Sequence, residues 1–524
     1  MSNILEQLPE RFNVAAHLIE GNLLSGNGDK IAFYSQNETY TYAQVSKFVQ
    51  QSAKLLSNLG IERENRIAIL LPDTPEFVFA FWGAIWLGAV PVPINTTCDI
   101  DDIQYILQDS RAKVLLASQK WEEKLNPIQS EFLRHVLLTD GDNPFLSLIT
   151  QQQKLSSYAE TFRDEPAFWL YTSGSTGRPK GVVHVHQSMV ICAEQYGKST
   201  LGLNRDDITY SVAKMSFAYG LGNTLYMPMS VGAASILSDT NNAFDVIADI
   251  HHYKPTIFFG IPNIYANILA LLDISPLDTS SLRLCVSAAE QLPKIIWEKW
   301  QENFHLEICE GIGTTEFLHI FLSNRIGKCK PGSSGLPVSG YDVQIINENG
   351  LKCADGEMGT LQVSGESLMQ NYWNRLQQTR KVIYGKTMQT GDKYIRDADG
   401  YFWFVGRKDD LFKVNGQWIS PLEIEGILHQ HPQVLEAAIL PESDNGENLT
   451  QIAAYISLKP GCKLTLELEY SIKKFAKHKL PHFKAPKAVY FVEKLPRTST
   501  GKIHRQSINK SQIISVQSSN EVKV

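Results

Sequence analysis

Between residues 66 and 316 the sequence alternates short apolar runs with amphipathic stretches. RIAILLP (66–72) and TIFFGIP (256–262) have the length and composition of buried strands, whereas DVIADIHHYK (245–254) and KIIWEKWQENF (294–304) are helix-like. This alternation predicts an α/β fold in which helices cover a mostly parallel sheet. Because 524 residues exceed what one hydrophobic core usually holds, we expect two or more domains.

The pattern of apolar and turn-forming residues changes after residue 330. Short alternating strands with Gly turns, as in GYDVQIINENG (340–350) and GEMGTLQVSG (356–365), predict a small β-barrel. The polar segment GRKDD (406–410) then precedes a new alternation of strands and a helix, at 435–440, 450–458, 465–477 and 487–495. This last part predicts a separate α+β domain.

Charge and apolar content restrict the partners and the location. A net charge of -6 and a pI near 6.1 leave no basic surface, so we expect no nucleic acid partner. Residues 77–94 carry no charge, but Pro91 and Pro93 interrupt them, which favours a buried helix that leads into a strand over a membrane span. The segment MSNILEQLPERFN is charged where a signal peptide is apolar, which favours a cytoplasmic location.

A loop at residues 171–181, YTSGSTGRPKG, follows the strand-like run AFWLYTS, and the stretch after it, VVHVHQSMVICAEQYG, is helix-like. Glycines let a backbone approach a phosphate, hydroxyl and N–H groups donate to its oxygens, and a helix N-terminus adds a favourable dipole. Lys180 would supply the countercharge. In a Walker A loop Ser or Thr follows the lysine, but here Gly181 follows Lys180, so we expect a different class of nucleotide site.

The loop resembles the hallmark motif of the adenylate-forming superfamily of acyl-CoA synthetases, peptide-synthetase adenylation domains and luciferases. Its sequence, YTSGSTGRPKGVVHVH, is most similar to that of benzoate and 4-hydroxybenzoate CoA ligases. The resemblance extends over residues 23–506, and further family motifs follow the loop in order: SAAE (287–290), GIGTTE (311–316), TGD (390–392), FVGRKDD (404–410) and PRTSTGK (496–502). Each alone has an ordinary interpretation, such as a turn, a helix cap or a solvated basic loop. Their order is what favours the family.

The resemblance implies a role for each motif. Residues 287–290 would lie against adenine, Asp392 would accept hydrogen bonds from the ribose hydroxyls, and Arg407 would meet the ribose and phosphates. The implied catalytic residues are Lys502, Thr315, which touches the α-phosphate, and Glu316, which is also the metal ligand. The implied ATP- and AMP-binding residues are Thr172, Ser173, Gly174, Ser175, Thr176, Gly177, Lys180, Ala288, Ala289, Glu290, Gly311, Thr314, Asp392, Phe404 and Arg407.

The resemblance also implies the fold and the reaction. The expected fold has a large N-terminal domain, residues 1–408, with two α/β sheet subdomains and a small β-barrel. A small mobile α+β C-terminal domain, residues 409–524, would turn about a hinge at Asp409 between two half-reactions. With ATP and Mg²⁺ the chain would convert a small carboxylic acid to an acyl adenylate and then transfer the acyl group to a thiol. That thiol belongs to coenzyme A or to the phosphopantetheine arm of an acyl carrier protein, and we expect a monomer or homodimer.

The acid is the least determined part of this interpretation. Phe217, Ala218, Tyr219 and Gly220, with Gly313 and His319, resemble the acid pocket of aryl-CoA ligases, and Lys413 also fits the benzoate-type pattern. An aromatic lining suits a flat ring, although Phe217 and Tyr219 also have the composition of ordinary core residues. Benzoate-like acids are therefore favoured, with aliphatic acids as the alternative. A light-emitting oxidative enzyme and a catalytically inactive binding protein are the remaining interpretations.

Overall fold

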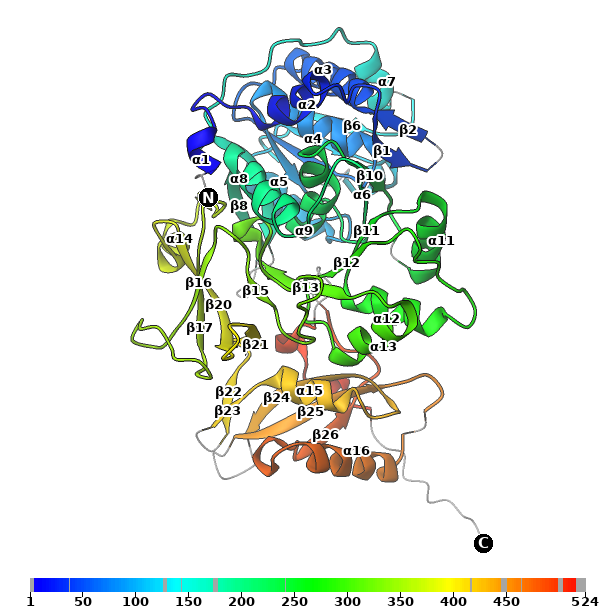
Figure 1. The fold of residues 1–524 in the computed structure, drawn as a ribbon, viewed down its shortest axis with the longest axis vertical. Coiled ribbons are helices and arrows are strands. Elements are labelled where there is room, and N and C mark those ends of the chain that lie inside the picture. The colour runs from blue at the N-terminus through cyan, green and yellow to red at the C-terminus, as the bar shows by residue number, and fades with distance from the viewer. Residues whose placement is uncertain are drawn as a thin grey trace. The chain divides into compact units, whose positions relative to one another are not determined.

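The computed structural model describes residues 4–36, 38–125, 130–142, 144–172, 178–240, 242–414, 417–443, 450–462, 464–497 and 503–514. The chain forms two compact units. The first comprises Met1–Gln344, Gln362–Thr390 and Asp397–Trp403, and the second comprises Ile345–Leu361, Gly391–Arg396 and Phe404–Val524. Many of the elements of both units are labelled in Figure 1.

The first unit contains two mainly parallel sheets. One has the order β4-β3-β5-β6, and all of its strand pairs are parallel. The other has nine strands in the order β15-β14-β13-β12-β11-β9-β10-β1-β2, with antiparallel pairs only at its two ends. The predicted mixed α/β class with separate sheets is confirmed. The strands are β1 (Ile31–Ser35), β2 (Glu38–Thr41), β3 (Arg66–Leu70), β4 (Val90–Pro93), β5 (Val114–Ala117), β6 (His135–Leu138), β9 (Ile208–Ser211), β10 (Ala234–Leu237), β11 (Ile257–Gly260), β12 (Leu284–Ser287), β13 (Ile308–Gly313), β14 (Ile320–Ser323) and β15 (Leu336–Pro337).

Helices lie beside these sheets (Figure 1). In α11 (Ala243–Tyr253) the buried residues are Ala243, Val246, Ile247 and Ile250, the spacing that places one face against a sheet. The other helices of this unit are α1 (Ile4–Gln7), α2 (Val14–Leu24), α3 (Tyr42–Asn58), α4 (Pro75–Leu87), α5 (Ile100–Ser110), α6 (Glu122–Leu125), α7 (Phe145–Thr150), α8 (His186–Cys192), α9 (Ala218–Leu221), α10 (Met227–Met229), α12 (Pro262–Leu271), α13 (Lys294–Phe304) and α14 (Leu376–Val382). The π-helical turns η2 (Ala193–Lys198) and η3 (Gly222–Tyr226) continue α8 and α9.

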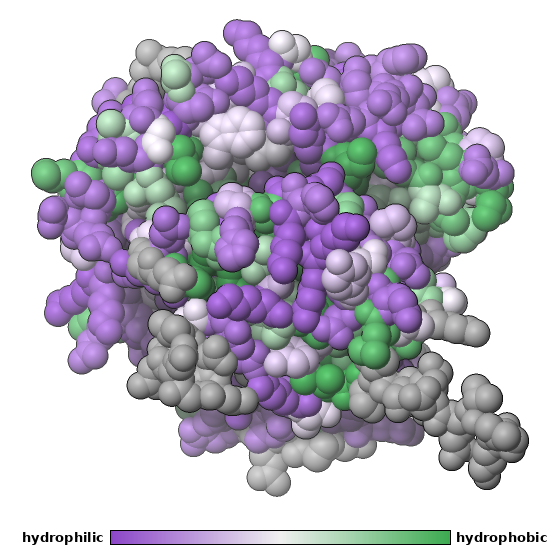
Figure 2. Space-filling view, turned by 90° about the horizontal axis from the view of Figure 1, so that it is seen from below, coloured by the Kyte–Doolittle hydropathy of each residue, from purple (hydrophilic) through white to green (hydrophobic). Residues whose placement is uncertain are grey.

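The uncharged stretch at residues 77–94 forms a buried helix that leads into a strand, as predicted. Helix α4 ends at Gly88, whose φ of +81° is a conformation that glycine adopts without strain, and β4 follows at Val90. Phe77, Trp82 and Trp86 are completely buried. None of the helices in the described part of the chain has the length and apolar character that a membrane crossing needs. On the face in Figure 2 hydrophilic residues predominate, with hydrophobic residues scattered among them.

The segment after the glycine-rich loop differs from the prediction. Strand β7 (Pro166–Thr172) pairs antiparallel with β8 (Lys180–Val185), so that Thr172 lies opposite Lys180. The expected helix directly after the loop is therefore wrong, because α8 begins only at His186. Strand β8 lies between β7 and β18 (Asn371–Tyr372) in one sheet, and its β-branched valines are buried, which favours a strand. The loop connects two antiparallel strands; its residues 173–177, which include the predicted Ser173, Gly174, Ser175, Thr176 and Gly177, lie outside the described residues.

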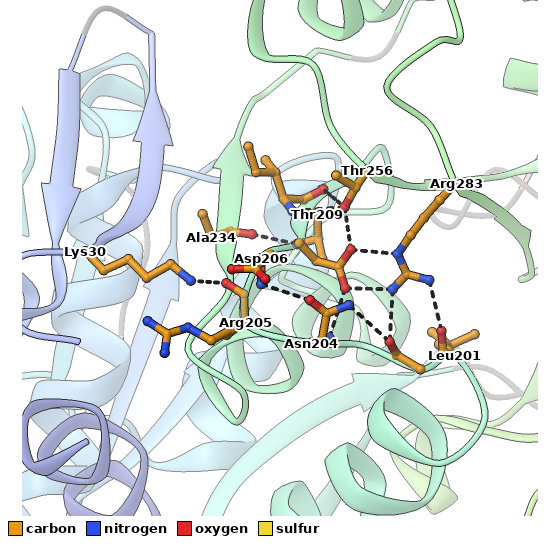
Figure 3. A network of polar contacts seen from close by, with 12 residues as sticks. Lys30, Leu201, Asn204, Arg205, Asp206, Thr209, Ala234, Thr256 and Arg283 are labelled. Atoms are coloured by element: carbon orange, nitrogen blue, oxygen red, sulfur yellow. Dashed lines mark hydrogen bonds and ion pairs between the residues drawn. The ribbon is translucent and has the colours of Figure 1, made fainter. Parts of the chain in front are cut away.

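An ionic network ties the beginnings of three parallel strands together (Figure 3). Asp207, just before β9, accepts hydrogen bonds from Arg283, just before β12, through Nε at 2.7 Å and Nη2 at 2.6 Å. Thr256, just before β11, donates to the same carboxylate at 2.7 Å. Burial raises the pKa of Asp207, but the hydrogen bonds from Arg283 and Thr256 outweigh burial and hold it below its usual value. This edge is opposite the carboxyl ends of the strands, where ligands of α/β sheets bind.

A further sheet has the order β16-β17-β20-β19, with β21 paired to β20. Its strands are β16 (Asp342–Ile346), β17 (Gly359–Ser364), β19 (Ile383–Tyr384), β20 (Thr387–Arg396) and β21 (Phe402–Arg407). The C-terminal part then forms the hairpin β22 (Phe412–Val414) and β23 (Gln417–Ile419), and a sheet of β24 (Val434–Ser443), β25 (Thr450–Leu458) and β26 (Ala488–Phe491) with α15 (Pro421–Leu428) and α16 (Leu466–Lys479). Ile424, Leu428, Ile439 and Ile472 share its core, which confirms the predicted separate α+β domain. The boundary between residues 408 and 409 stays a prediction.

Candidate active site

The end of β13 and the turn that follows it contain six of the motif residues, at positions 311–316, which we call the 311–316 turn. β13 and β14 are so close that a Cβ on Gly313 would lie 2.1 Å from the carbonyl oxygen of His319. A Cβ on Gly311 would lie 2.9 Å from Ile320 Cγ2, so both positions need glycine. In the described part of the chain the buried hydroxyl of Thr314 has no hydrogen-bond partner. A polar group left in this way is typical of a site that receives a ligand.

Three contacts fix the backbone of the short helix η4 (Thr315–Phe317). His184 Nε2 lies 2.7 Å from the carbonyl oxygen of Thr315, and the Met369 N–H donates to the carbonyl of Glu316 at 2.7 Å. The Ser367 hydroxyl donates to the carbonyl of Phe317 at 2.9 Å. Burial lowers the pKa of His184 to about 4, although its hydrogen bond to Thr315 acts in the opposite direction. At neutral pH the ring is therefore neutral, and its Nε2–H donates to Thr315.

The side chains of Glu316 and Lys180 both contact Tyr372. The Tyr372 hydroxyl donates to Glu316 Oε1 at 2.5 Å, and Lys180 Nζ lies 4.5 Å from the centre of the tyrosine ring. The structure thus brings together two predicted residues that are far apart in the sequence. Tyr372 was not predicted, because a single tyrosine in a strand has the pattern of an ordinary core residue. No signal in the sequence alone would have selected it.

The predicted adenine segment follows β12, next to β13. Ser287 lies opposite Glu310 at the end of the parallel pairing between β12 and β13, so residues 288–290 and 311–316 both follow directly after this paired part of the two strands. Ala289 has a φ of +73°, an uncommon conformation for a residue with a Cβ. Ala288 is buried, whereas Ala289 and Glu290 are exposed.

A buried carboxyl group connects the two segments. Glu310 Oε1 accepts the Leu292 N–H at 3.0 Å, and Oε2 is buried without a hydrogen-bond partner in the described part of the chain. Burial raises the pKa of Glu310 to about 8, although the hydrogen bond from Leu292 acts in the opposite direction. The group is therefore mostly protonated at neutral pH.

The predicted acid-pocket residues also lie together. The His319 ring is 5.7 Å from that of Tyr219 and 5.0 Å from that of Tyr196. Asn223 presents Oδ1 to His319 Nε2 at 3.2 Å. Burial lowers the pKa of His319 to about 3, although a hydrogen bond to the Tyr219 backbone acts in the opposite direction, so the ring is neutral. Tyr196 is a pocket candidate that the sequence did not reveal.

The neighbouring residues explain the shape of this cluster. Phe217 caps α9, which Ala218 begins, and a Cβ on Gly220 would lie 2.2 Å from the carbonyl oxygen of Lys214. The carbonyl of His319 packs against Gly313, which joins the acid-pocket candidates to the 311–316 turn. Of the predicted pocket residues, Tyr219 and His319 therefore form an aromatic cluster with Tyr196 beside that turn.

In the second unit the structure pairs Asp392 with Arg407. Arg407 Nη1 lies 2.9 Å from Asp392 Oδ1, and the aspartate side chain is 4% exposed whereas that of the arginine is 49% exposed. The rings of Phe404 and Tyr394 are 5.4 Å apart. Two residues from separate motifs are thus in contact, and the buried carboxylate is fixed by the more exposed guanidinium.

Three other predicted residues have less defined surroundings. Asp409 lies in an exposed turn after β21, where a change of backbone conformation disturbs little packing. Lys413 Nζ lies 4.7 Å from the ring centre of Trp418, its partner across the β22–β23 hairpin, which is the contact of an ordinary surface lysine. Lys502 lies outside the described residues.

Residues 23–373 match the AMP-binding enzyme family, and residues 423–502 match the AMP-binding enzyme C-terminal domain. The chain is an AMP-binding enzyme. Among its relatives, the benzoate–CoA ligase of Thauera aromatica is 38% identical over 95% of this chain and 96% of the relative. The 4-hydroxybenzoate–CoA/benzoate–CoA ligase of Rhodopseudomonas palustris is also 38% identical, over 94% of this chain and 93% of the relative.

Solved structures agree with this family assignment. An anthranilate CoA ligase in complex with anthranoyl-AMP superimposes on the AMP-binding enzyme with a TM-score of 0.91 at 37% identity, covering 97% of this chain and 98% of that one. A benzoate CoA ligase from Burkholderia xenovorans gives a TM-score of 0.85 at 36% identity, covering 94% and 99% of the two chains. The similarity therefore extends over both units.

The donor set of this AMP-binding enzyme is compatible with magnesium. The described residues contain no group of three or more His, Cys, Asp and Glu side chains that could hold a metal by themselves. Magnesium, however, takes oxygen ligands and is usually bound by one or two carboxylates together with substrate phosphates. Glu316, with one oxygen on the Tyr372 hydroxyl, supplies a carboxylate of this kind beside the 311–316 turn. The residues present thus fit a magnesium ion that arrives with ATP.

Proposed function

We propose that this AMP-binding enzyme is an aryl acid–coenzyme A ligase. It joins a benzoate-like acid to ATP as an acyl adenylate, with release of pyrophosphate, and then transfers the acyl group to the thiol of coenzyme A. The observation that carries the proposal is the 38% identity, over nearly the whole chain, to ligases named for benzoate and 4-hydroxybenzoate. The aromatic cluster of Tyr219, Tyr196 and His319 supports it.

In the first half-reaction the acid carboxylate attacks the α-phosphate of ATP in line, and catalysis consists mainly of positioning and charge neutralisation. We assign Lys180 and the loop of residues 172–177 to the phosphates, and Thr315 and Lys502 to the reacting phosphate. Asp392 holds the ribose and is itself fixed by Arg407. Magnesium, when bound at Glu316, would neutralise phosphate charge.

The neutral imidazole of His319 indicates how the acid lies in the pocket. A buried histidine with a pKa of about 3 carries no positive charge at neutral pH, so it does not neutralise a carboxylate. We therefore place the ring of the acid, and not its carboxylate, against His319 and Tyr219. The carboxylate then faces Gly313 and the 314–316 turn, where the α-phosphate has to lie.

The second half-reaction is assigned to the same chain with a different arrangement of its C-terminal domain. In this proposal residues 409–524 turn about Asp409 after pyrophosphate leaves, so that Lys502 withdraws and a thiolate attacks the acyl carbon of the adenylate, forming the thioester and expelling AMP. Coenzyme A is the proposed acceptor because the relatives are named as CoA ligases. The phosphopantetheine arm of a carrier protein is the alternative thiol of the same chemistry.

Acid-dependent exchange between ATP and pyrophosphate tests the first half-reaction. Benzoate, 4-hydroxybenzoate and anthranilate should support exchange in the presence of Mg²⁺, whereas hexanoate should support little. Incubation with coenzyme A, or separately with a phosphopantetheinylated carrier protein, then identifies the acceptor by mass spectrometry. Exchange with hexanoate alone would contradict the aryl assignment, and no exchange with any acid would contradict adenylation.

Gly222→Ala should weaken acid binding selectively. A Cβ at this position would lie 2.4 Å from His319 Cδ2 and 2.8 Å from the Tyr226 hydroxyl, so the histidine must move within a packed cluster. Overpacking of this kind costs about 1–3 kcal/mol, so we expect the KM for benzoate to rise by roughly tenfold while the KM for ATP stays unchanged.

Gly21→Ala is the matched control for this substitution, because nothing lies within 4 Å of a Cβ at that helical position. It should leave both KM values at the wild-type level. An unchanged KM for benzoate in Gly222→Ala would contradict the placement of His319 in the acid pocket.

A further inference from the structure

Tyr372 makes one contact with an anion and another with a cation. It is 5% exposed and lies in β18, opposite Val182 of β8. Its hydroxyl donates to Glu316 Oε1 at 2.5 Å, and its ring centre lies 4.5 Å from Lys180 Nζ. Both contacts are with residues that the proposed function assigns to the nucleotide and its metal.

The Tyr372 hydroxyl restricts the side-chain conformation of Glu316, which the other contacts described above do not fix. Met369 already fixes the backbone carbonyl of Glu316, and His184 fixes that of Thr315. These bonds set the path of the chain but not the side-chain torsions of the glutamate. A buried hydroxyl on Oε1 restricts those torsions, so less conformational entropy is lost when the carboxylate takes a metal ligand's position.

The ring has the complementary effect on Lys180. An ammonium group above a tyrosine face is attracted by the negative face of the ring, and it keeps its charge and its N–H donors. A direct salt bridge from Lys180 to Glu316 would occupy both groups with each other. Tyr372 contacts the Glu316 carboxylate through its hydroxyl and the Lys180 ammonium group through its ring face. It thereby keeps Glu316 available for the metal and Lys180 available for phosphate.

We propose that Tyr372 is a positioning residue for the adenylation half-reaction: it orients the Glu316 carboxylate toward the magnesium of ATP and holds Lys180 for the phosphates. This inference rests on the proposed function. It assigns to one tyrosine the coupling between the metal ligand of the 311–316 turn and the lysine at the end of the 171–181 loop.

Two variants separate the two contacts. Tyr372→Phe removes the hydroxyl and keeps the ring, so we expect the Mg²⁺ concentration for half-maximal pyrophosphate exchange to rise by about tenfold, with the KM for the acid unchanged. Tyr372→Leu also removes the aromatic face, so this variant, unlike Tyr372→Phe, should in addition weaken the binding of ATP in the absence of magnesium. Tyr384→Phe, at an exposed tyrosine in β19, is the control and should match the wild type.

Calorimetric binding of ATP with and without Mg²⁺ tests the inference independently of turnover. Tyr372→Phe should weaken the binding of MgATP and leave the binding of free ATP unchanged. If Tyr372 acts through Glu316, adding Tyr372→Phe to Glu316→Gln should cause no further loss of MgATP affinity. A wild-type Mg²⁺ dependence of Tyr372→Phe, or additive losses in the double variant, would overturn the inference. Absence of exchange with every acid in the wild type would instead overturn the proposed function, because the binding measurements do not need an acid.

Discussion

Lys502→Ala is expected to slow acyl adenylate formation by about a hundredfold or more, and to leave thioester formation from a premade acyl adenylate close to the wild-type rate. During in-line attack negative charge accumulates around the α-phosphate, and an ammonium group aimed at it stabilises the transition state more than the ground state. Loss of one such donor typically costs about 3 kcal/mol, which corresponds to roughly a hundredfold in rate. In the proposed cycle Lys502 leaves before the thiolate attacks, so the second half-reaction does not depend on it.

The measurement is the single-turnover rate of each half-reaction. Pyrophosphate release from ATP and benzoate reports the first, and benzoyl-CoA formation from synthetic benzoyl-AMP reports the second. Lys494→Ala, at an exposed lysine of the same segment, is the matched control and should change neither rate. Equal losses in both half-reactions of Lys502→Ala would contradict the assignment of the lysine to adenylation alone.

Glu310→Gln is expected to change how the stability of the enzyme depends on pH. The carboxyl group has a pKa of about 8 in the folded chain, raised from 4.5 chiefly by burial. Between these two values the unfolded chain gives up its proton while the folded chain retains it, so rising pH favours unfolding. The wild type should therefore lose about 1.4 kcal/mol of stability per pH unit through this group, whereas the amide of the variant cannot titrate.

Urea unfolding near pH 5.5 and near pH 7.5 provides the test. Over these two pH units the variant should gain roughly 3 kcal/mol in unfolding free energy relative to the wild type. The amide has N–H groups to satisfy where Oε2 is buried, so the absolute stability at one pH is not the criterion. Glu302→Gln, at an exposed glutamate of α13, is the matched control. A constant difference for Glu310→Gln would show that Glu310 is ionised in the folded enzyme.

The sheets could be predicted from the sequence because their signal is local. The predicted strands at 66–72 and 256–262 correspond to β3 and β11, and the predicted helices at 245–254 and 294–304 correspond to α11 and α13. Residues 182–185 were assigned to a helix because the stretch that follows is helical. Pairing with β7 on one side and β18 on the other decided their conformation, and β18 comes from a distant part of the chain.

The site shows the same division between local and distant information. Motif order was sufficient to select Glu316, Asp392 and Arg407, and the structure pairs the last two. Tyr372 and Tyr196 were missed because each is an ordinary core residue until its partner is known. The Glu316 carboxylate that Tyr372 contacts is 56 positions away in the sequence, and no spacing rule connects the two. The roles of the motif residues stay predictions until the substitutions above are measured.

The ionic network around Asp207 affects which substitutions this enzyme can tolerate. It fixes β9, β11 and β12 at their starting edge, whereas the acid-pocket candidates follow the opposite ends of strands in the same sheet. Substitutions that reshape the pocket therefore do not have to be compensated by the contacts that hold these strands in register. An engineer who exchanges the residues around Tyr219 for those of a relative that activates another acid should therefore obtain folded protein.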